Sequence, residues 1–397
     1  MSVLGKGRGA SDAKQASSVA VLVDTATDWG RGVILGVTSY AQKHGPWFLQ
    51  VEPRGRENKM QLPRDWSGDG IIARISNERI ARDLQSRRVP VVNISGIELD
   101  GFHFPRVAID YDAAAELAAE HFRSRGFRRF AYVGPLGLSY VAKQAEAFQN
   151  RIAKDGRKLN RFNYAYESMA SDRWHKQSQR LGLWLAELRK PIAVFAWGTS
   201  ASCQLLDVCR FRNIVVPDEV AVLAGTTDDV ISQTTVPQMS GILNPSRQIG
   251  YRAAERLARM IYGQADDGHD ENLAPIEVLT RGSTDVLAIE DPELFAAVRY
   301  IREHAFSELT VDAVASSVPM TRRSLERKFK ATFDRTPLAE IHRLRIARVR
   351  ELLATTDMPI SQIAIATGFG TPEYMTTMFK RESGLTPLRY RSTTRAR

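Results

Sequence analysis

Residues 360–391 read ISQIAIATGFGTPEYMTTMFKRESGLTPLRYR, and this stretch decides the fold of the last quarter of the chain. A short helix begins near residue 361, and Gly368 supplies a tight turn. Thr371 is a good N-cap for a second helix. Met375 and Phe379 lie one helical turn apart, so both face inward. Two short helices joined by a tight turn predict a helix-turn-helix unit.

The same layout occurs once earlier in the chain. Thr310 is a good N-cap for a helix over 311–316, and Thr321 for a helix over 322–333. Apolar positions of the second helix, Leu325 among them, must face the core, so its basic side chains are left outside. The duplication is the strongest signal in the sequence, because a single helix-turn-helix pattern is common.

A predicted helix over 337–354 connects the two units, and another over 293–305 precedes them. At ~1.5 Å per residue the connector is roughly 27 Å long. Successive major grooves on one side of B-DNA lie ~34 Å apart. One rigid connector can therefore hold two recognition helices in consecutive grooves.

The excess positive charge lies in this region. Residues 294–397 carry 18 Lys/Arg and 10 Asp/Glu, a net charge of +8 out of +10 for the whole chain. A basic region attached to a near-neutral one favours a polyanionic partner such as nucleic acid. With 397 residues, two or three domains are expected. No apolar run reaches the ~18 residues that cross a bilayer, and no secretion signal is present, so a cytoplasmic location is expected.

Residues 19–280 alternate apolar stretches of strand length with helical stretches, which predicts βαβ units and two parallel sheets. The chain is expected to cross between the sheets near 105–112 and 240–245. Such folds bind ligands at the carboxyl ends of their strands. The predicted strands cover 19–23, 70–75, 89–94, 107–110, 130–134, 193–197 and 220–224, and the helices 32–44, 80–87, 113–125, 141–152, 203–211 and 245–262.

The stretch 360–391 resembles the signature of AraC-type regulators, which covers the last hundred residues. The resemblance implies that the two recognition helices contact DNA. Arg323, Glu326 and Arg327 match the first base-contacting positions. Thr377 stands where some members have arginine, so the second helix is expected to act more as a phosphate clamp. The DNA-binding residues implied are Arg322, Arg323, Glu326, Arg327, Lys330, Glu373, Thr376, Thr377, Lys380 and Arg381.

Residues 19–280 are similar to the LacI/GalR-type sugar-sensing domain. The similar stretches are 108–110, 125–134 (RGFRRFAYVG), 216–222 (VPDEVAV) and 244–250. The fusion of this domain to an AraC-type tail is similar to the layout of xylose operon regulators. It implies that a monosaccharide such as xylose binds between two lobes and controls the DNA-binding units.

The pocket departs from the family pattern. Sugar sites use carboxylates, amides and arginines over aromatic faces. At positions that are usually acidic or basic, this chain has Arg74, Gln144, Trp197-Gly198 and Thr226-Thr227. The candidate effector-binding residues are Asp24, Trp29, Arg31, Asp110, Trp197 and Asp228.

The sequence therefore predicts an α/β, two-lobed, periplasmic-binding-protein-like domain over 19–285 and an all-α domain with two helix-turn-helix units over 286–397. Residues 1–18 are expected to form a disordered lead-in. The expected partners are double-stranded DNA, a small effector, a second copy of the chain in a homodimer, and RNA polymerase. No metal, no cofactor and no membrane contact are expected.

Two other functions stay open. In one, the sensor is vestigial and the tail binds DNA constitutively. In the other, the chain is an enzyme with a DNA-binding tail, such as a DNA-repair alkyltransferase, which would need an activated cysteine. Cys203 and Cys209 match no metal or redox spacing and lie in an apolar stretch, so they favour packed thiols and no enzymatic activity.

Overall fold

The structure is a computed structural model that describes residues 16–51, 62–165, 171–286, 288–289 and 291–395. It divides into two compact units. Unit 1 comprises residues up to Ala119, Phe130–Leu188 and Val194–Thr284. Unit 2 comprises Asp285–Arg397 together with two segments from the first part of the chain, Glu120–Arg129 and Arg189–Ala193.

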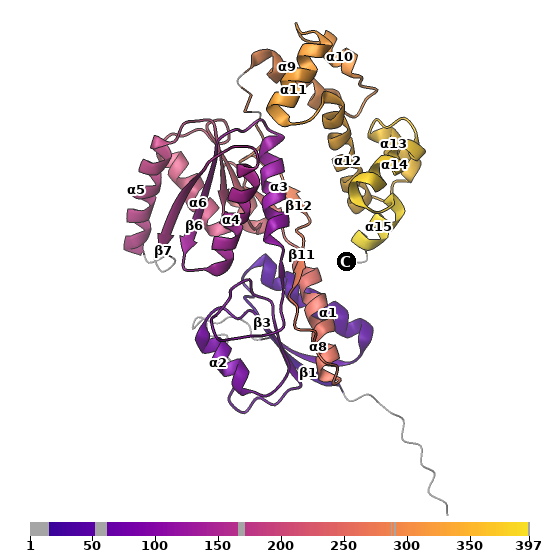
Figure 1. Cartoon of the computed structure of the whole chain (residues 1–397). Coiled ribbons are helices and arrows are strands. Elements are labelled where there is room, and N and C mark those ends of the chain that lie inside the picture. Colours follow the sequence, from indigo (N-terminus) through magenta and orange to yellow (C-terminus); the bar gives the residue numbers. More distant parts are fainter. Residues whose placement is uncertain (1–15, 52–61, 166–170, 287, 290, 396–397) are drawn as a thin grey trace, which may run out of the picture. The chain divides into compact units, whose positions relative to one another are not determined.

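Unit 1 contains two mainly parallel sheets, one in each of two lobes (Figure 1). The first sheet has the strand order β2-β1-β3-β4 and is parallel throughout. Its strands are β1 (Ser17–Leu22), β2 (Trp47–Val51), β3 (Gly70–Ala73) and β4 (Val91–Asn93), and its helices are α1 (Asp28–His44), α2 (Glu78–Ser86) and α8 (Ser246–Ile261).

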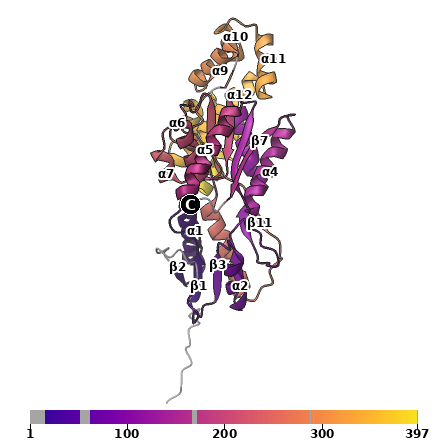
Figure 2. The same ribbon diagram turned by 90° about the vertical axis from the view of Figure 1, so that its left-hand side faces the viewer.

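Strand β1 is buried on both faces because helices cover both sides of the sheet. Val19 and Val21 pack into a cluster with α1 and α8. Ala20 and Leu22, on the opposite face, pack toward α2 (Figure 2). Successive side chains of a strand alternate between faces, so a parallel strand covered twice becomes a continuous apolar run.

Helices α1 and α8 approach each other closely through glycines. A Cβ atom at Gly36 would collide with the carbonyl oxygen of Arg247, and one at Gly250 with the carbonyl of Val33. Only glycine allows the two backbones to approach this closely. This contact holds α8 against the first lobe, although α8 follows the second lobe in sequence.

The second sheet has the strand order β12-β10-β9-β8-β6-β7, with β12 antiparallel to β10. Its strands are β6 (Phe130–Leu136), β7 (Leu159–Ala165), β8 (Ile192–Ala196), β9 (Val220–Ala224), β10 (Ser240–Leu243) and β12 (Glu277–Leu279). The helices between them are α4 (Ser139–Ala153), α5 (Ser171–Glu187), α6 (Thr199–Phe211) and α7 (Asp229–Thr234).

The chain crosses between the lobes three times. The short strands β5 (Val107–Ile109) and β11 (Glu271–Leu273) pair in parallel at two of the crossings. The third crossing lies between β10 and α8. The sequence predicted the crossings at 105–112 and 240–245 but missed the return through β11.

Unit 2 is built mainly from helices. The end of α3 (Tyr111–Arg123) belongs to it, whereas the beginning of α3 belongs to unit 1. The other helices are α9 (Pro292–His304), α10 (Val311–Ser316), α11 (Arg322–Phe333), α12 (Pro337–Thr355), α13 (Ile360–Ala366), α14 (Pro372–Ser383) and α15 (Pro387–Arg395).

The predicted fold class is confirmed, with one correction at the N-terminus. Ser17 and Ser18 begin β1 and pair with Trp47 and Phe48, so they are not part of a disordered lead-in. The rest of that predicted segment, residues 1–15, lies outside the described residues. Ser17 is buried, which explains why polarity alone misjudged the start of the strand.

We predict that Gly36→Val destabilises the protein by about 1–3 kcal/mol, because the new side chain must push α8 away from α1. The adjacent control, Leu35→Val, introduces the same side chain at an exposed position and should cost much less. Urea unfolding followed by circular dichroism measures both. Equal losses for the two variants would contradict the role of the close helix contact.

Candidate functional site

The first helix-turn-helix unit of unit 2 is formed by α10 and α11, with the bounds that the sequence predicted. The hydroxyl of Thr310 accepts the Ala313 N–H at 3.2 Å, and that of Thr321 accepts the Ser324 N–H at 3.3 Å. Each hydroxyl satisfies an N–H group that the first turn of a helix leaves without a partner. Leu325 is fully buried, as its spacing predicted.

The second unit, α13 and α14, has the same construction. Thr371 caps α14 through the Tyr374 N–H at 3.3 Å, and Met375 and Phe379 are fully buried. Each unit has its own apolar core. The connector α12 contributes Ile341 to the first core and Val349 to the second.

Arg345 on α12 holds the two units in one arrangement. Its guanidinium donates to the carbonyl of Ala305 and to that of Ser307, both at 2.7 Å. It also lies 5.8 Å from the ring of Phe369, in the turn of the second unit. The neighbouring Gly368 has φ +73 and is so close to the backbone at Phe306 that a Cβ would not fit.

The predicted DNA-binding residues differ in whether their charges are already paired. Arg322 donates to Asp312 at 2.8 Å and to Glu326 at 3.1 Å. Lys330 pairs with Asp334. In contrast, Arg323 and Arg327 are exposed and make no hydrogen bond or ion pair with any described residue.

The second recognition helix shows a similar division. The side chain of Lys380 is exposed and makes no hydrogen bond or ion pair within the described part of the chain. The guanidinium of Arg381, in contrast, forms an ion pair with the carboxylate of Glu382 at 3.4 Å. The Thr377 hydroxyl donates to the carbonyl of Glu373 at 2.9 Å. Glu373 and Thr377 lie on the exposed side of α14, and Thr376 is half-buried.

A buried network of charged residues connects α3 with α12 inside unit 2. Glu340 on α12 forms an ion pair with Arg335 at 3.0 Å and another with Arg343 at 2.8 Å. Arg335 also pairs with Glu120 near the end of α3. Burial alone would raise the pKa of Glu340, but the hydrogen bond from Arg343 and the charges of the arginines lower it.

His121 is buried beside this network. Burial holds the pKa of its imidazole well below the usual range, and the nearby Arg125 adds to the effect. The ring is therefore neutral in the folded protein at neutral pH. The sequence places His121 on the apolar face of its helix but does not predict the network beside it, because α3 precedes the DNA-binding region by almost two hundred residues.

The main cavity of unit 1 has a volume of about 720 Å³ and lies between its two lobes. Its wall follows the carboxyl ends of strands from both sheets, the place where such sheets bind ligands. The polar and aromatic lining residues are Asp24, Thr27, Asp28, Trp29, Arg74, Ser76, Asn77, Ser95, Tyr111, Tyr140, Trp197, Thr199, Ser200, Thr226, Thr227 and Asp228.

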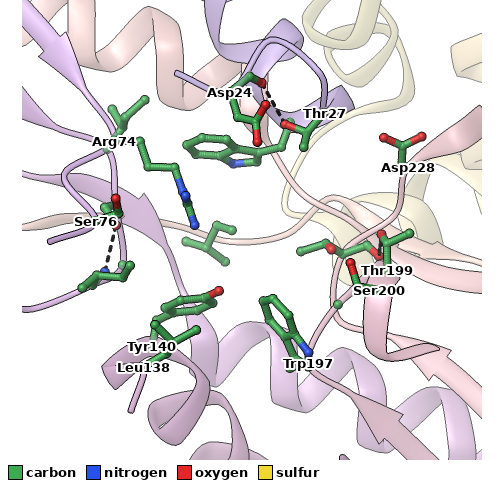
Figure 3. A pocket seen from close by; sticks show the side chains of 18 of the residues that line it. Asp24, Thr27, Arg74, Ser76, Leu138, Tyr140, Trp197, Thr199, Ser200 and Asp228 are labelled. Atoms are coloured by element: carbon green, nitrogen blue, oxygen red, sulfur yellow. Dashed lines mark hydrogen bonds between the residues drawn. The ribbon is translucent and has the colours of Figure 1, made fainter. Parts of the chain in front are cut away.

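Aromatic side chains form part of this wall. Tyr140 and Trp197 lie edge to face with ring centroids 6.1 Å apart, and the Trp197 indole N–H donates to the Tyr164 hydroxyl at 2.9 Å. Figure 3 shows Tyr140 and Trp197 side by side, with Arg74 reaching into the space from the other lobe. The indole N–H of Trp29 is buried and has no hydrogen-bond partner among the described residues.

The two lobes also touch directly at the rim of the cavity. The Asp28 N–H donates to the Asp228 carboxylate at 3.2 Å, and the Asp229 N–H donates back to Asp28. Arg31 pairs with Asp28, and Arg281 pairs with Asp229 at 2.6 Å. These contacts join the first turn of α1 to that of α7.

The structure brings four of the six predicted effector residues to the cavity wall, namely Asp24, Trp29, Trp197 and Asp228. Arg31 does not line it. Asp110 caps α3 by accepting the Ala113 N–H at 2.9 Å and lines a smaller neighbouring pocket. Tyr140 and Ser76 were missed, although a search for polar residues directly after each strand would have found Ser76.

The comparisons with known proteins agree with this geometry. Residues 18–116 match the XylR N-terminal domain, residues 119–284 the periplasmic binding protein-like domain, and residues 314–393 a helix-turn-helix domain. The xylose operon regulatory protein of Escherichia coli (strain K12) is 28% identical over 382 residues, covering 94% of this chain and 96% of that protein.

The corresponding protein of Haemophilus influenzae is also 28% identical, over 95% of this chain and 99% of its own length. A solved structure of the xylose-binding transcription activator XylR is similar with a TM-score of 0.62 and 26% identity, covering 96% of this chain and 99% of that one. The regulator CcpA of Lactococcus lactis, at 20% identity and a TM-score of 0.54, shares the fold over 68% of this chain.

The chain thus combines a periplasmic-binding-like sensor domain with an AraC-type DNA-binding domain, in the layout of the xylose operon regulatory proteins. It is a DNA-binding transcription regulator. No helix in the described part of the chain is long and apolar enough to cross a membrane.

We predict that Arg345→Met lowers the stability of the DNA-binding unit by about 1.5–3 kcal/mol, because two carbonyl groups lose a charged donor while the apolar stem is kept. Chemical denaturation with a reporter in unit 2 measures the loss. Arg348→Met, on the exposed side of the same helix, is the control. A loss no greater than that of the control would contradict the role of Arg345.

We predict that stability falls as the pH drops below about 6.5, because the unfolded chain protonates His121 there and the folded chain does not. The contribution is fully present above the unfolded pKa and is lost as the pH falls toward the folded pKa. At pH 5.5 the loss of folding free energy amounts to at most about 1.4 kcal/mol. The difference in Tm between pH 7.5 and 5.5 should be smaller in His121→Gln; an unchanged difference would rule the group out.

Proposed function

We propose that this regulator binds its operator with two recognition helices, α11 and α14, and that a sugar-like effector in the cavity of unit 1 controls this binding. The observation that carries the DNA-binding part concerns α11. Arg323 and Arg327 are exposed and make no ion pair with any described residue, whereas the other charged side chains of this helix form ion pairs within unit 2. A guanidinium without a protein partner is free to bind guanine edges or phosphate.

The proposed roles differ along the tail. Arg323 and Arg327 contact bases, and Glu326 accepts hydrogen bonds from base amino groups or orients Arg322. Lys380 and Arg381 bind phosphates, with Glu373, Thr376 and Thr377 on the groove-facing side of α14. We assign the second helix mainly to anchoring, because its unpaired charge, Lys380, lies in its last turns.

For the effector, the support comes from the cavity and the relatives. The cavity has the size of a small-ligand site, and polar groups and aromatic rings lie on its wall. The E. coli relative is named for the xylose operon, so a monosaccharide such as xylose is the first candidate. The contacts of Asp28 with Asp228 and Asp229 would stabilise a closed form, and an effector that binds this form more tightly shifts the population toward it.

We further propose that the chain works as a cytoplasmic homodimer, that it contacts RNA polymerase, and that it has no enzymatic activity. Burial raises the pKa of the Cys203 thiol, and Cys209 is buried. An activated cysteine nucleophile needs a lowered pKa and an accessible thiol, so neither residue fits that role. A constitutive regulator with a vestigial sensor is the alternative, and effector response separates the two.

The test of DNA binding begins with selection of a target duplex from a random library, followed by fluorescence anisotropy at fixed salt. We expect Arg327→Ala to weaken specific binding by about 1–3 kcal/mol, or roughly 5- to 150-fold. Arg322→Ala is the matched control and should have a smaller effect, because Arg322 is held by Asp312 and Glu326. No selectable sequence preference would refute the proposed function.

Lys380→Ala should weaken binding to specific and random duplexes alike and reduce the salt slope by about one. The reason is that a phosphate contact releases counterions but does not distinguish sequences. Titrations at several salt concentrations measure the slope. A change in sequence preference without a change in slope would assign Lys380 to base contact instead.

A further inference from the structure

Arg74 is the one cation on the wall of the main cavity among the described residues. It comes directly after β3, and its side chain is half-buried. Its guanidinium makes no hydrogen bond or ion pair with any described residue. Figure 3 shows this side chain extending into the cavity toward Tyr140.

The carboxylates of the same wall are already engaged. Asp24 accepts the Ala26 N–H at 3.1 Å. Asp28 pairs with Arg31 and accepts a backbone N–H. Asp228 accepts the Ile231 N–H at 3.3 Å and the Asp28 N–H at 3.2 Å. None of them forms an ion pair with Arg74.

A partly desolvated guanidinium without a counter-charge is unfavourable. The hydroxyl groups of a neutral sugar can accept its hydrogen bonds but cannot neutralise it. A carboxylate does both, because it matches the guanidinium through two parallel hydrogen bonds. Phosphate would bring up to two negative charges, of which the one guanidinium among the described residues of the wall neutralises only one.

We infer that the effector is a sugar acid, a polyhydroxylated molecule whose single carboxylate binds Arg74. This inference rests on the proposed function, since it specifies the chemical class of the effector in the same cavity. Thr27, Ser76 and Asp228 also line the cavity and can bind the hydroxyl groups. Tyr140 and Trp197 offer apolar ring surface to the carbon skeleton.

The experiment compares D-xylose, D-xylonate, D-glucuronate and D-glucose 6-phosphate as probes of the full-length protein by thermal shift and isothermal titration calorimetry. We expect the two sugar acids to bind at least tenfold more tightly than D-xylose. Their affinity should fall as the salt concentration rises, because the contact is partly exposed to solvent.

The variants are Arg74→Gln, Arg74→Lys and the control Arg82→Gln, an exposed arginine of the same lobe that does not line the cavity. Arg74→Gln should weaken sugar-acid binding about 10- to 100-fold and bring it close to that of D-xylose. Arg74→Lys should restore binding in part, because it keeps the charge but not the two parallel bonds. Circular dichroism and the Tm without ligand check that each variant folds.

Three outcomes would overturn the inference. If D-xylose binds as tightly as the acids, the effector is a neutral sugar and the proposed function stands. If D-glucose 6-phosphate binds best, the anionic group that Arg74 binds is a phosphate and not a carboxylate. If no sugar or sugar acid binds the wild-type protein, the effector-controlled part of the proposed function fails as well. Loss of acid binding in Arg82→Gln equal to that in Arg74→Gln would also count against a direct contact.

Discussion

The arrangement of the two helix-turn-helix units depends on Arg345. Each unit has its own apolar core, and the shared helix α12 packs into both cores. The guanidinium of Arg345 adds a further constraint, because it bonds two carbonyls after α9 and lies against Phe369 of the second turn. Gly368 permits the close approach that this contact needs. A separation that is fixed before binding favours the binding of one duplex by both recognition helices, since ordering them on the DNA would cost affinity.

The charged network around Glu340 has a similar role on the other side of α12. Arg335 bonds both Glu340 and Glu120, so the end of α3 is part of the DNA-binding unit and is not a separate attachment. The beginning of the same helix, at Tyr111, lies on the wall of the main cavity of unit 1. A single helix of 13 residues therefore contributes to both compact units.

Much of the fold was predictable because local signals decided it. Thr310 and Thr321 mark the starts of α10 and α11, and both helices have the predicted bounds. The strand β7 and the helix α5 were missed because their exposed faces carry polar residues that hide the apolar pattern, and the short apolar strand β2 was missed as well. The position of Glu120–Arg129 in unit 2 could not be predicted from the sequence, since it depends on contacts with residues almost two hundred positions away. Among the site residues, Asp110 was assigned to the ligand although a closer partner, the Ala113 N–H, already uses its carboxylate.

Ion pairs within the protein also decide how much positive charge the tail can offer to DNA. The net charge of the tail suggested a broad basic surface, but ion pairs within the first helix-turn-helix unit and at the end of α11 hold Arg322 and Lys330. Exposed pairs of this kind contribute little to stability. Their larger effect is on binding, because DNA phosphates must compete with Asp312, Glu326 and Asp334 for these cations. On the two recognition helices, the cations without an ion pair among the described residues are Arg323, Arg327 and Lys380. In the cavity of unit 1 the same counting applies: the carboxylates already accept hydrogen bonds, whereas Arg74 has no hydrogen-bond or ion-pair partner among the described residues, and we infer that it favours a ligand with one carboxylate.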